Sequence, residues 1–140
     1  LANPDIRPTA TEIAWTRDAF RDLLRIRSST TLLRLRTAAD IRQRLTFHNV
    51  GSSQVPTVLA AHLNGAGYAG AGFAELAYFV NVDTVPHTVT VDALRGKAFQ
   101  LHPVHRAATA ADKRAAQASY ASATGAFTVP PRTAVVFVVD

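Results

Sequence analysis

The hydrophobic period of the chain changes once, near residue 28. Before that point, apolar side chains recur at helical spacing and cover a broad stripe: Ile13, Trp15, Ala19, Phe20, Leu23, Leu24 and Ile26. Residues 9–12, Thr-Ala-Thr-Glu, have the form of a capping box, and residues 28–31, Ser-Ser-Thr-Thr, favour a helix end. The pattern therefore predicts one amphipathic helix over residues 9–27, with an apolar face broad enough to need a large partner surface.

Beyond residue 32 the pattern becomes that of short strands bounded by turn residues. The expected strands lie at residues 44–50, 57–63, 75–83, 88–91, 97–104, 126–129 and 133–139. Residues 75–83, ELAYFVNVD, are nearly all apolar, so we expect a central strand with Tyr78 and Phe79 on opposite faces. The last two strands, joined by Pro-Pro-Arg, predict a closing hairpin.

The remaining segments predict connections. Residues 32–35 predict a short turn or strand, and residues 107–119, which are alanine-rich without an apolar period, predict a surface loop or short helical turn. Residues 65–72, GAGYAGAG, predict a flexible hairpin loop, since they lack the preceding strand and following helix of a phosphate-binding loop. The fold class that follows is mainly β: an antiparallel β-sandwich of about seven to eight strands preceded by one N-terminal α-helix.

Composition excludes several classes of protein. The 140 residues suit one domain, and the lack of cysteine excludes disulfides and thiolate metal sites. No apolar run approaches the roughly 20 residues of a membrane span. The net charge of +5 is concentrated before residue 45, but the arginines there alternate with acids at helical spacing, which argues against nucleic-acid binding. The chain begins at Leu1 instead of Met, so we expect a cut piece or a mature product.

The residues able to carry chemistry are scattered over the expected strands and loops. The histidines are His48, His62, His87, His102 and His105, and the acids of the strand region are Glu75, Asp83, Asp92, Asp112 and Asp140. Serines lie mainly in loops, without the strained turn of a nucleophile elbow. We therefore expect no catalytic residue, no metal site and no cofactor in this chain.

A sugar-binding surface would need exposed aromatic side chains. The single tryptophan, Trp15, falls on the predicted helix, and at least one of Tyr78 and Phe79 belongs to the core. Tyr68 in the glycine-rich loop and Tyr120 are the remaining carbohydrate-binding candidates, with Phe73 beside the loop.

Several motifs, in order, resemble the C-terminal part of bacterial pullulanase-type α-1,6-glucosidases, enzymes of the α-amylase superfamily. Residues 20–51, FRDLLRIRSSTTLLRLRTAADIRQRLTFHNVG, resemble the junction that follows the catalytic barrel in that family. Residues 75–91, ELAYFVNVDTVPHTVTV, resemble its apolar strand, Asn-centred turn and next strand. FQLHPVH and ASYASATGAFTVPPRTAVVFV resemble its closing strands. One departure is Thr31, where the family pattern has proline, which predicts a looser turn.

The resemblance implies a division of the chain and a role. Residues 1–31 would be the last helix of the catalytic barrel with its junction, and residues 32–140 a C-terminal β-sandwich domain. The domain would be a non-catalytic accessory part of a starch-debranching enzyme, capping and stabilising the barrel of the same polypeptide through Phe20, Leu23 and Leu24. The aspartate nucleophile, glutamate acid/base and second aspartate of such enzymes would lie upstream of Leu1. The resemblance also implies an extracellular or cell-surface parent.

Two other functions remain open at this stage. One is a starch or α-glucan-binding module of the same enzyme, using Tyr68 and Tyr120. The other is a basic interaction domain for an acidic partner, using Arg25, Arg27, Arg34, Arg36, Arg42 and Arg44. If the chain folds without a barrel, we expect Phe20 and Leu24 either to pack back on the sheet or to associate with a second copy.

Overall fold

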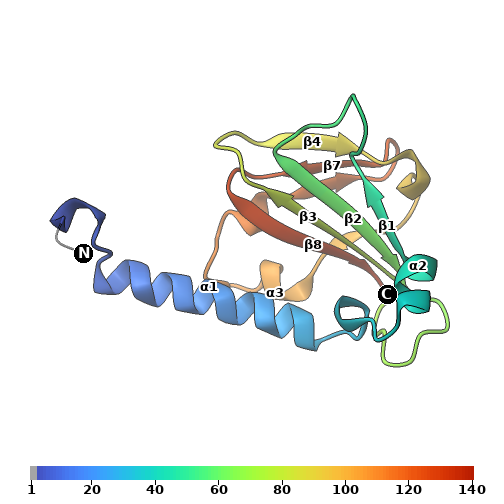
Figure 1. Cartoon of the computed structure of the whole chain (residues 1–140), viewed down its shortest axis with the longest axis horizontal. Helices are drawn as coiled ribbons and strands as arrows, with labels where there is room; N and C mark the ends of the chain where they lie inside the picture. The colour runs from blue at the N-terminus through green and yellow to red at the C-terminus, as the bar shows by residue number, and fades with distance from the viewer. Residues whose placement is uncertain (1–2) are drawn as a thin grey trace.

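The computed structural model describes residues 3–140 and places one long helix beside a two-layer β-sandwich (Figure 1). The strands are β1 Leu45–His48, β2 Val58–Asn64, β3 Glu75–Asn81, β4 His87–Thr90, β5 Gln100–Leu101, β6 Ser119–Ala121, β7 Ala126–Val129 and β8 Thr133–Val139. The helices are α1 Ala10–Ser28, α2 Ala38–Arg44 and α3 Pro103–Arg106, with short 3₁₀ turns η1 Pro4–Ile6, η2 Leu32–Arg34, η3 Asp92–Leu94 and η4 Ala115–Gln117.

The strands form two antiparallel sheets, which confirms the predicted sandwich. One sheet has the order β1-β2-β3-β8-β5 and the other the order β4-β7-β6. As predicted, β3 is central, and its side chains alternate: Phe79 enters the core between the sheets, whereas Tyr78 packs on the outer face of the larger sheet. Phe79, Phe127 and Phe137 are almost completely buried, and the rings of the first two lie 4.6 Å apart.

The predicted closing hairpin is wrong, because β7 and β8 belong to different sheets. β7 pairs with β4 and β6, whereas β8 pairs with β3 and β5. The chain crosses between the layers at residues 130–132, where two prolines lack ladder donors and Arg132 adopts a positive φ of 47°. The buried Asn81 holds this crossing, since its side-chain amide donates to the Val129 and Pro130 carbonyls at 3.2 and 3.0 Å.

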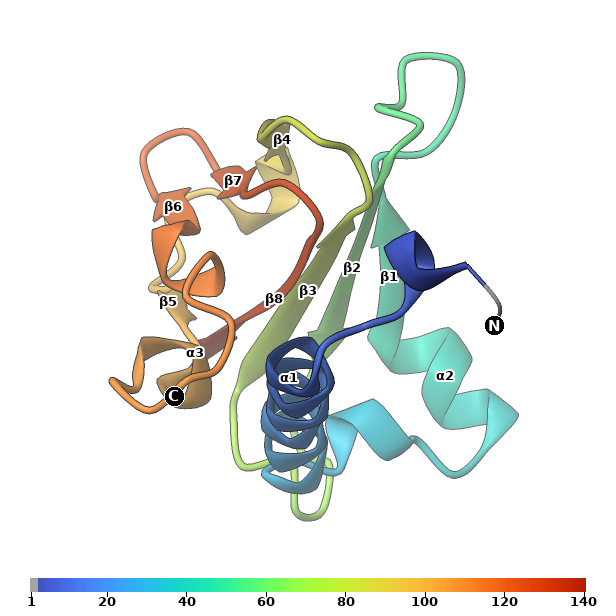
Figure 2. The ribbon, with the colours of Figure 1, turned by 90° about the vertical axis from the view of Figure 1, so that its left-hand side faces the viewer.

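Helix α1 forms as predicted, with its capping box in place. The Thr9 hydroxyl accepts from the Glu12 N–H at 3.2 Å, and the Glu12 carboxylate accepts from the Thr9 N–H at 2.7 Å. These bonds lower the pKa of Glu12. Figure 2 looks along the helix and shows it lying against the outer side of the larger sheet.

The sandwich holds the middle of α1 through the backbone of one residue, Ala111. The Asp22 carboxylate accepts the Ala111 N–H at 2.8 Å, and the Trp15 indole N–H donates to the Ala111 carbonyl at 3.1 Å. Farther along the helix, the buried Ile26 packs with Leu32, Leu76 and other side chains on the outer face of the sheet. The helix is therefore fixed to the sandwich at its middle and at its C-terminal end.

The glycine-rich segment 65–72 lies in a hairpin connection, as predicted, between the antiparallel strands β2 and β3, but it is packed against the end of α1. The Thr30 hydroxyl donates to the Ala71 carbonyl, and the Thr31 N–H and hydroxyl donate to the Gly70 and Ala69 carbonyls at 3.1 and 2.8 Å. A Cβ at Gly70 would lie 2.9 Å from the Thr31 methyl group, so glycine permits this close approach. Thr31 thus makes two bonds that the proline of the family pattern cannot make, and the looser turn is not observed.

The predicted strand 44–50 is shorter in the structure, because a helix occupies the residues before it. Helix α2 covers Ala38–Arg44, and the Thr37 hydroxyl caps it by accepting the Asp40 N–H at 3.0 Å. The capping signal is present in the sequence, but the helix has only seven residues and no buried side chain. The strand then begins at Leu45 and ends at His48.

The predicted strand 97–104 is also mostly wrong. Only Gln100–Leu101 pair with β8, and Pro103 starts the short helix α3, at a position where proline is favoured because no N–H is needed. Within the expected loop 107–119, the short helical turn is η4, and Ser119 already begins β6.

His102 connects α3 to the end of α1. Its Nδ1 accepts the Val104 N–H at 3.2 Å, and its Nε2 lies 3.1 Å from the Ser29 hydroxyl, so the neutral ring donates to Ser29 through Nε2. The side chain is 2% exposed. Burial, together with the positive charges of His105 and Arg106, lowers the pKa of His102 to about 4.

Replacing Thr31 with proline should destabilise the junction. Thr31→Pro removes both bonds to the glycine-rich segment, which we expect to cost about 1–2 kcal/mol after the entropic gain from proline is subtracted. Thr31→Val is the matched control, since it keeps the N–H and loses only the hydroxyl bond. Urea unfolding of both variants measures the difference. A proline variant more stable than the valine variant would show that these contacts contribute nothing.

His102 should make the fold sensitive to acid. An unfolded histidine with pKa near 6.5 binds a proton as the pH falls from about 6.5 to 4, whereas folded His102 stays neutral. The stabilising contribution is therefore complete above pH 6.5 and decreases across this window, by about 3 kcal/mol at most. His102→Asn keeps a capping acceptor without titrating, so its unfolding free energy should depend less on pH in this range. Parallel pH curves for the two proteins would contradict this assignment.

Candidate functional site

Helix α1 is apolar on two opposite sides. The side toward the sandwich carries the apolar residues Trp15 and Ile26, with Asp22 between them, at positions i, i+11 and i+7. Ile13, Phe20 and Leu24 repeat the same spacing two residues earlier, which places them about 200° around the helix, on the side facing away. These three side chains are 57%, 60% and 45% exposed. The helix therefore presents a second apolar stripe that nothing in the described structure covers.

The interface residues predicted from the sequence all lie outside the core. Phe20 and Leu24 belong to the outward stripe, and Leu23, 40% exposed, lies between the stripe and the sheet. Of the two outcomes expected for Phe20 and Leu24, packing back on the sheet does not occur. Association with a second copy stays a prediction.

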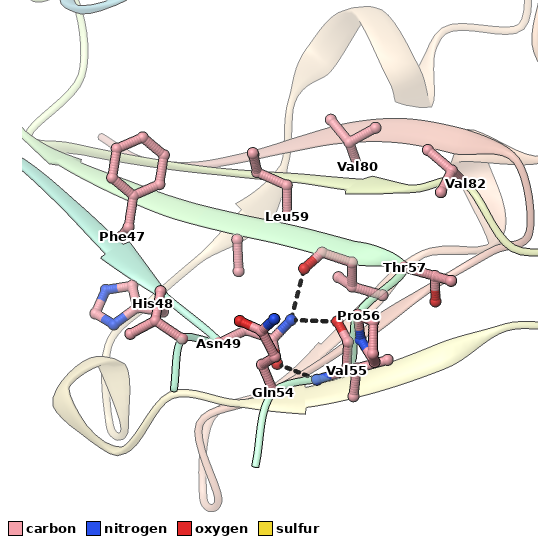
Figure 3. Close-up of a pocket in the computed structure, with 13 residues that line it drawn as sticks. Phe47, His48, Asn49, Gln54, Val55, Pro56, Thr57, Leu59, Val80 and Val82 are labelled. Carbon is pink, nitrogen blue, oxygen red and sulfur yellow. Dashed lines mark hydrogen bonds between the residues drawn. The ribbon is translucent and has the colours of Figure 1, made fainter. Parts of the chain in front are cut away.

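A second exposed apolar surface lies on the outer face of the larger sheet. Figure 3 shows Phe47 on β1, Leu59 on β2 and Val80 on β3, with Val82 just beyond the end of β3. Together they line an open hollow, which has a volume of about 490 Å³. Phe47 is 51% exposed and Val82 67%. Strands β2 and β3 are paired on both sides and give Leu59 and Val80 a rigid base, whereas β1, which carries Phe47, is an edge strand paired with β2 alone.

The helix and sheet surfaces adjoin along β8. Leu23 and Ala134 line the same small hollow beneath α1, Ala134 pairs with Val80, and Val80 pairs with Leu59 on the next strand. We call this combined apolar surface the docking surface. It consists of Ile13, Phe20, Leu23, Leu24, Phe47, Leu59, Val80 and Val82.

Asn49 fixes the loop at the upper rim of the docking surface. Its side-chain amide donates to the Val55 and Val58 carbonyls, and its oxygen accepts the Val55 N–H at 2.8 Å (Figure 3). Its backbone has a positive φ of 54°, which asparagine tolerates better than most residues. Asn49, near the end of the junction motif at residues 20–51, thus closes a loop of the sandwich.

The structure places the two candidate carbohydrate-binding tyrosines apart, and both have neighbours over their rings. The Arg44 guanidinium lies 4.7 Å above the Tyr68 ring, and Arg44 also donates to the Asn64 and Ala66 carbonyls. Tyr68 itself packs at the edge of the outer-face cluster, with Phe73 as a neighbour in the same cluster.

Tyr120 lies inside the sandwich. Its ring contacts those of Phe99 and Phe127 at 5.5 and 4.5 Å, and its hydroxyl donates to the Leu94 carbonyl. A tyrosine used in this way has little ring surface left for a sugar. The carbohydrate-binding role of the two tyrosines stays a prediction, and the geometry gives it little support.

One cluster of titratable groups lies at an end of the sandwich core. The Glu75 carboxylate accepts from His62 Nε2 at 2.8 Å and from Lys97 Nζ at 2.6 Å, and the His48 ring lies 6.2 Å from that of His62. Burial lowers the pKa of His62, although Glu75 acts in the opposite direction. Because both Glu75 oxygens are already engaged, this cluster is suited to joining strands.

The described residues give no support for other chemistry. Between residues 3 and 140, no three His, Cys, Asp or Glu side chains gather in a way that could hold a metal ion. In the same range, no helix has both the length and the hydropathy to cross a membrane. Of the arginines considered for a basic interaction domain, Arg25 pairs with Asp22, and Arg44 is engaged with Tyr68 and two carbonyls.

Sequence reasoning missed the sheet part of the docking surface. The signal was present, because residues 75–83 are apolar at nearly every position, which is typical of a strand covered on both faces. It did not reveal that α1 covers only part of the outer face.

Comparison with known proteins identifies the family. All residues, 1–140, match the family described as alpha-1,6-glucosidases, pullulanase-type, C-terminal. The chain is 34% identical over 146 residues to pullulanase 1 of Arabidopsis thaliana chloroplasts, covering 99% of this chain and 15% of that protein. The chain therefore spans a small part of that relative, and the relatives are not confined to bacteria.

Solved structures show the same fold. PulA from Klebsiella oxytoca superposes with a TM-score of 0.80 at 22% identity, over 94% of this chain and 12% of that one. A mutant pullulanase from Paenibacillus barengoltzii complexed with maltotriose superposes with a TM-score of 0.63 at 21% identity, over 85% of this chain and 16% of that one. From its sequence match over every residue, this chain belongs to the family of C-terminal domains of pullulanase-type α-1,6-glucosidases.

Proposed function

We propose that this chain is a non-catalytic accessory domain that packs against, caps and stabilises the catalytic barrel of a pullulanase-type starch-debranching enzyme. Hydrolysis of α-1,6-glucosidic bonds would take place in the upstream part of the same polypeptide. The observation that carries the proposal is the outward apolar stripe of α1. A helix already anchored to the sandwich still exposes Ile13, Phe20 and Leu24 along its length.

The exposed stripe has an energetic consequence. Burying a large aliphatic or aromatic side chain stabilises a protein by roughly 1.5–3 kcal/mol relative to leaving it in water. Phe20 at 60% exposed and Leu24 at 45% exposed forgo much of this in the domain alone. A second body packed on the stripe would recover it, and the preceding barrel is the part of the polypeptide that α1 joins to the sandwich.

The docking surface also has a suitable shape. The helix stripe and the sheet hollow lie on two elements that meet along β8, so together they form an angled surface and not a flat one. A partner seated there would contact α1 and the outer sheet face at once. Such contact would fix the orientation of the two bodies, which is the capping role.

Within this proposal, residue 31 does not separate the barrel from the sandwich as sharply as the predicted division into residues 1–31 and 32–140 implies. Asp22 and Trp15 bind the sandwich through the backbone N–H and carbonyl of Ala111, while Phe20 and Leu24 face away from it. We infer that α1 is a wall shared by the barrel and the sandwich, belonging to both. Cutting the polypeptide at residue 31 would then expose apolar surface on each side.

The alternative of a starch-binding module centred on Tyr68 and Tyr120 has less support from the geometry. Affinity electrophoresis of the full polypeptide in amylopectin gels tests it directly. If Tyr68 is a binding platform, Tyr68→Ala should migrate faster in the presence of amylopectin than the unmodified enzyme does. Equal retardation of the two proteins would reject a site at Tyr68.

The capping role predicts that polar substitutions on the stripe weaken the whole enzyme. In the full-length polypeptide, Phe20→Ser with Leu24→Ser should lower the midpoint of heat inactivation by several degrees, because both side chains would be buried against the barrel. Val85→Ser is the matched control, since Val85 is 50% exposed but lies in the turn before β4, outside the docking surface. Activity on pullulan after heating gives the midpoint. Equal midpoints for the two variants would count against a docked helix.

A further inference from the structure

We propose that a hollow beside α1 is a surface site for a neutral carbohydrate chain, which would be an α-glucan if the proposed function holds. The hollow has a volume of about 410 Å³ and lies between α1 and the loop at residues 109–111. Its lining includes Trp15, Asp18, Arg21, Asp22, Arg25 and Thr109. We call it the Trp15 hollow.

Trp15 supplies a rigid aromatic wall. Its indole N–H is held by the Ala111 carbonyl at 3.1 Å, and the Arg114 guanidinium lies over the ring, 5.4 Å from its centroid. Unlike Trp15, Arg114 is not among the residues that line the hollow. Arg114 is itself fixed by two bonds of 2.8 Å to Asp112. The indole nevertheless remains 44% exposed. A ring already fixed in place can stack on the apolar face of a sugar without losing further conformational entropy.

The charges around the hollow are balanced within it. Asp18 pairs with Arg17 and Arg21 at 2.9 and 3.3 Å, and Asp22 pairs with Arg25 at 2.9 Å. The lining thus has two carboxylates and two guanidinium groups, and no net charge. This balance disfavours an anion or a cation as ligand. It leaves an array of donors and acceptors, which is what the hydroxyl groups of a neutral sugar require.

The Trp15 hollow would stay open when the docking surface is covered. Asp18, Arg21 and Arg25 line α1 on the side of the 109–111 loop, whereas Leu23 reaches Ala134 and the sheet. By helical geometry, Asp18 lies about 120–160° around α1 from Ile13, Phe20, Leu23 and Leu24, whereas Arg21 lies about 60° from Leu24, at the edge of the hollow. A barrel packed on the docking surface would therefore leave the Trp15 and Asp18 side of the hollow facing solvent.

The sequence offered a partial signal for this site. Trp15 is the single tryptophan of the chain, but its position on a helix argued for a packing role. The loop residue Thr109 is 94 positions away, and only the tertiary structure brings the two together at one hollow.

Two exposed arginines provide a matched test. Arg17 and Arg21 are 57% and 61% exposed and both pair with Asp18, but only Arg21 lines the hollow. In the full-length polypeptide, either substitution to alanine leaves Asp18 with one partner, so neither should alter folding. Arg21→Ala should migrate faster than Arg17→Ala on affinity electrophoresis in amylopectin gels. Trp15→Ala should show the larger loss.

Kinetics on two substrates separate the hollow from the active site. We expect Trp15→Ala to raise KM for amylopectin by about three- to tenfold, the loss of one aromatic contact. KM for a short branched oligosaccharide, too small to reach both sites, should not change. Equal retardation and equal KM for Arg17→Ala and Arg21→Ala would overturn the proposal, even if Trp15→Ala fails to fold.

The outcomes also distinguish this inference from the capping role. Suppose that the Phe20 and Leu24 double variant has a lower heat-inactivation midpoint, but that Arg17→Ala and Arg21→Ala bind glucan equally. The capping role would then stand, and the carbohydrate site at the Trp15 hollow would be rejected. If the polypeptide proves inactive on pullulan, gels containing other neutral polysaccharides still test the hollow. Competition by inorganic phosphate, without any by maltoheptaose, would overturn the neutral-carbohydrate assignment.

Discussion

The contact between α1 and the backbone of Ala111 is the interaction on which the rest of the arrangement depends. The N–H and the carbonyl of this one residue are bound by the Asp22 carboxylate and the Trp15 indole, respectively. A hydrogen bond to a charged group contributes about 1.5–3 kcal/mol, more than a neutral one. Because the sandwich attaches the helix through this polar contact and Ile26, Phe20 and Leu24 are free to face the other way.

The helix consequently has three distinct sides. One binds the sandwich, one exposes the apolar stripe of Ile13, Phe20 and Leu24, and one carries the paired charges around the Trp15 hollow. The docking surface extends the stripe across β8 to the sheet. In the proposed function, this division would allow a single 19-residue helix to join two bodies and still present a polar hollow to solvent.

Three buried or half-buried polar side chains hold elements of the fold together. Asn81 binds the crossing between the two sheets, Asn49 holds the loop after β1, and Glu75 joins His62 to Lys97. Each of these side chains is occupied by partners from elements that must stay together. This use of polar groups to join elements of the fold agrees with the accessory role proposed for the domain.

The sequence by itself determined the features that depend on neighbouring residues. The capping box and helical period specified α1, and the continuous apolar run specified β3 as the central strand with Tyr78 and Phe79 on opposite faces. Local sequence signals failed where the element was short or where two signals in the same segment favoured different structures. The seven-residue helix α2 was missed because it is short and buries no side chain, and Pro103 ended a strand that apolar residues favoured. Only the tertiary structure decided that β7 and β8 lie in different sheets, that Arg44 covers Tyr68, and that Phe47 and Leu59 stay exposed. The physical reason is that a side chain's hydropathy sets its preference for burial, whereas the segment that buries it comes from a distant part of the chain.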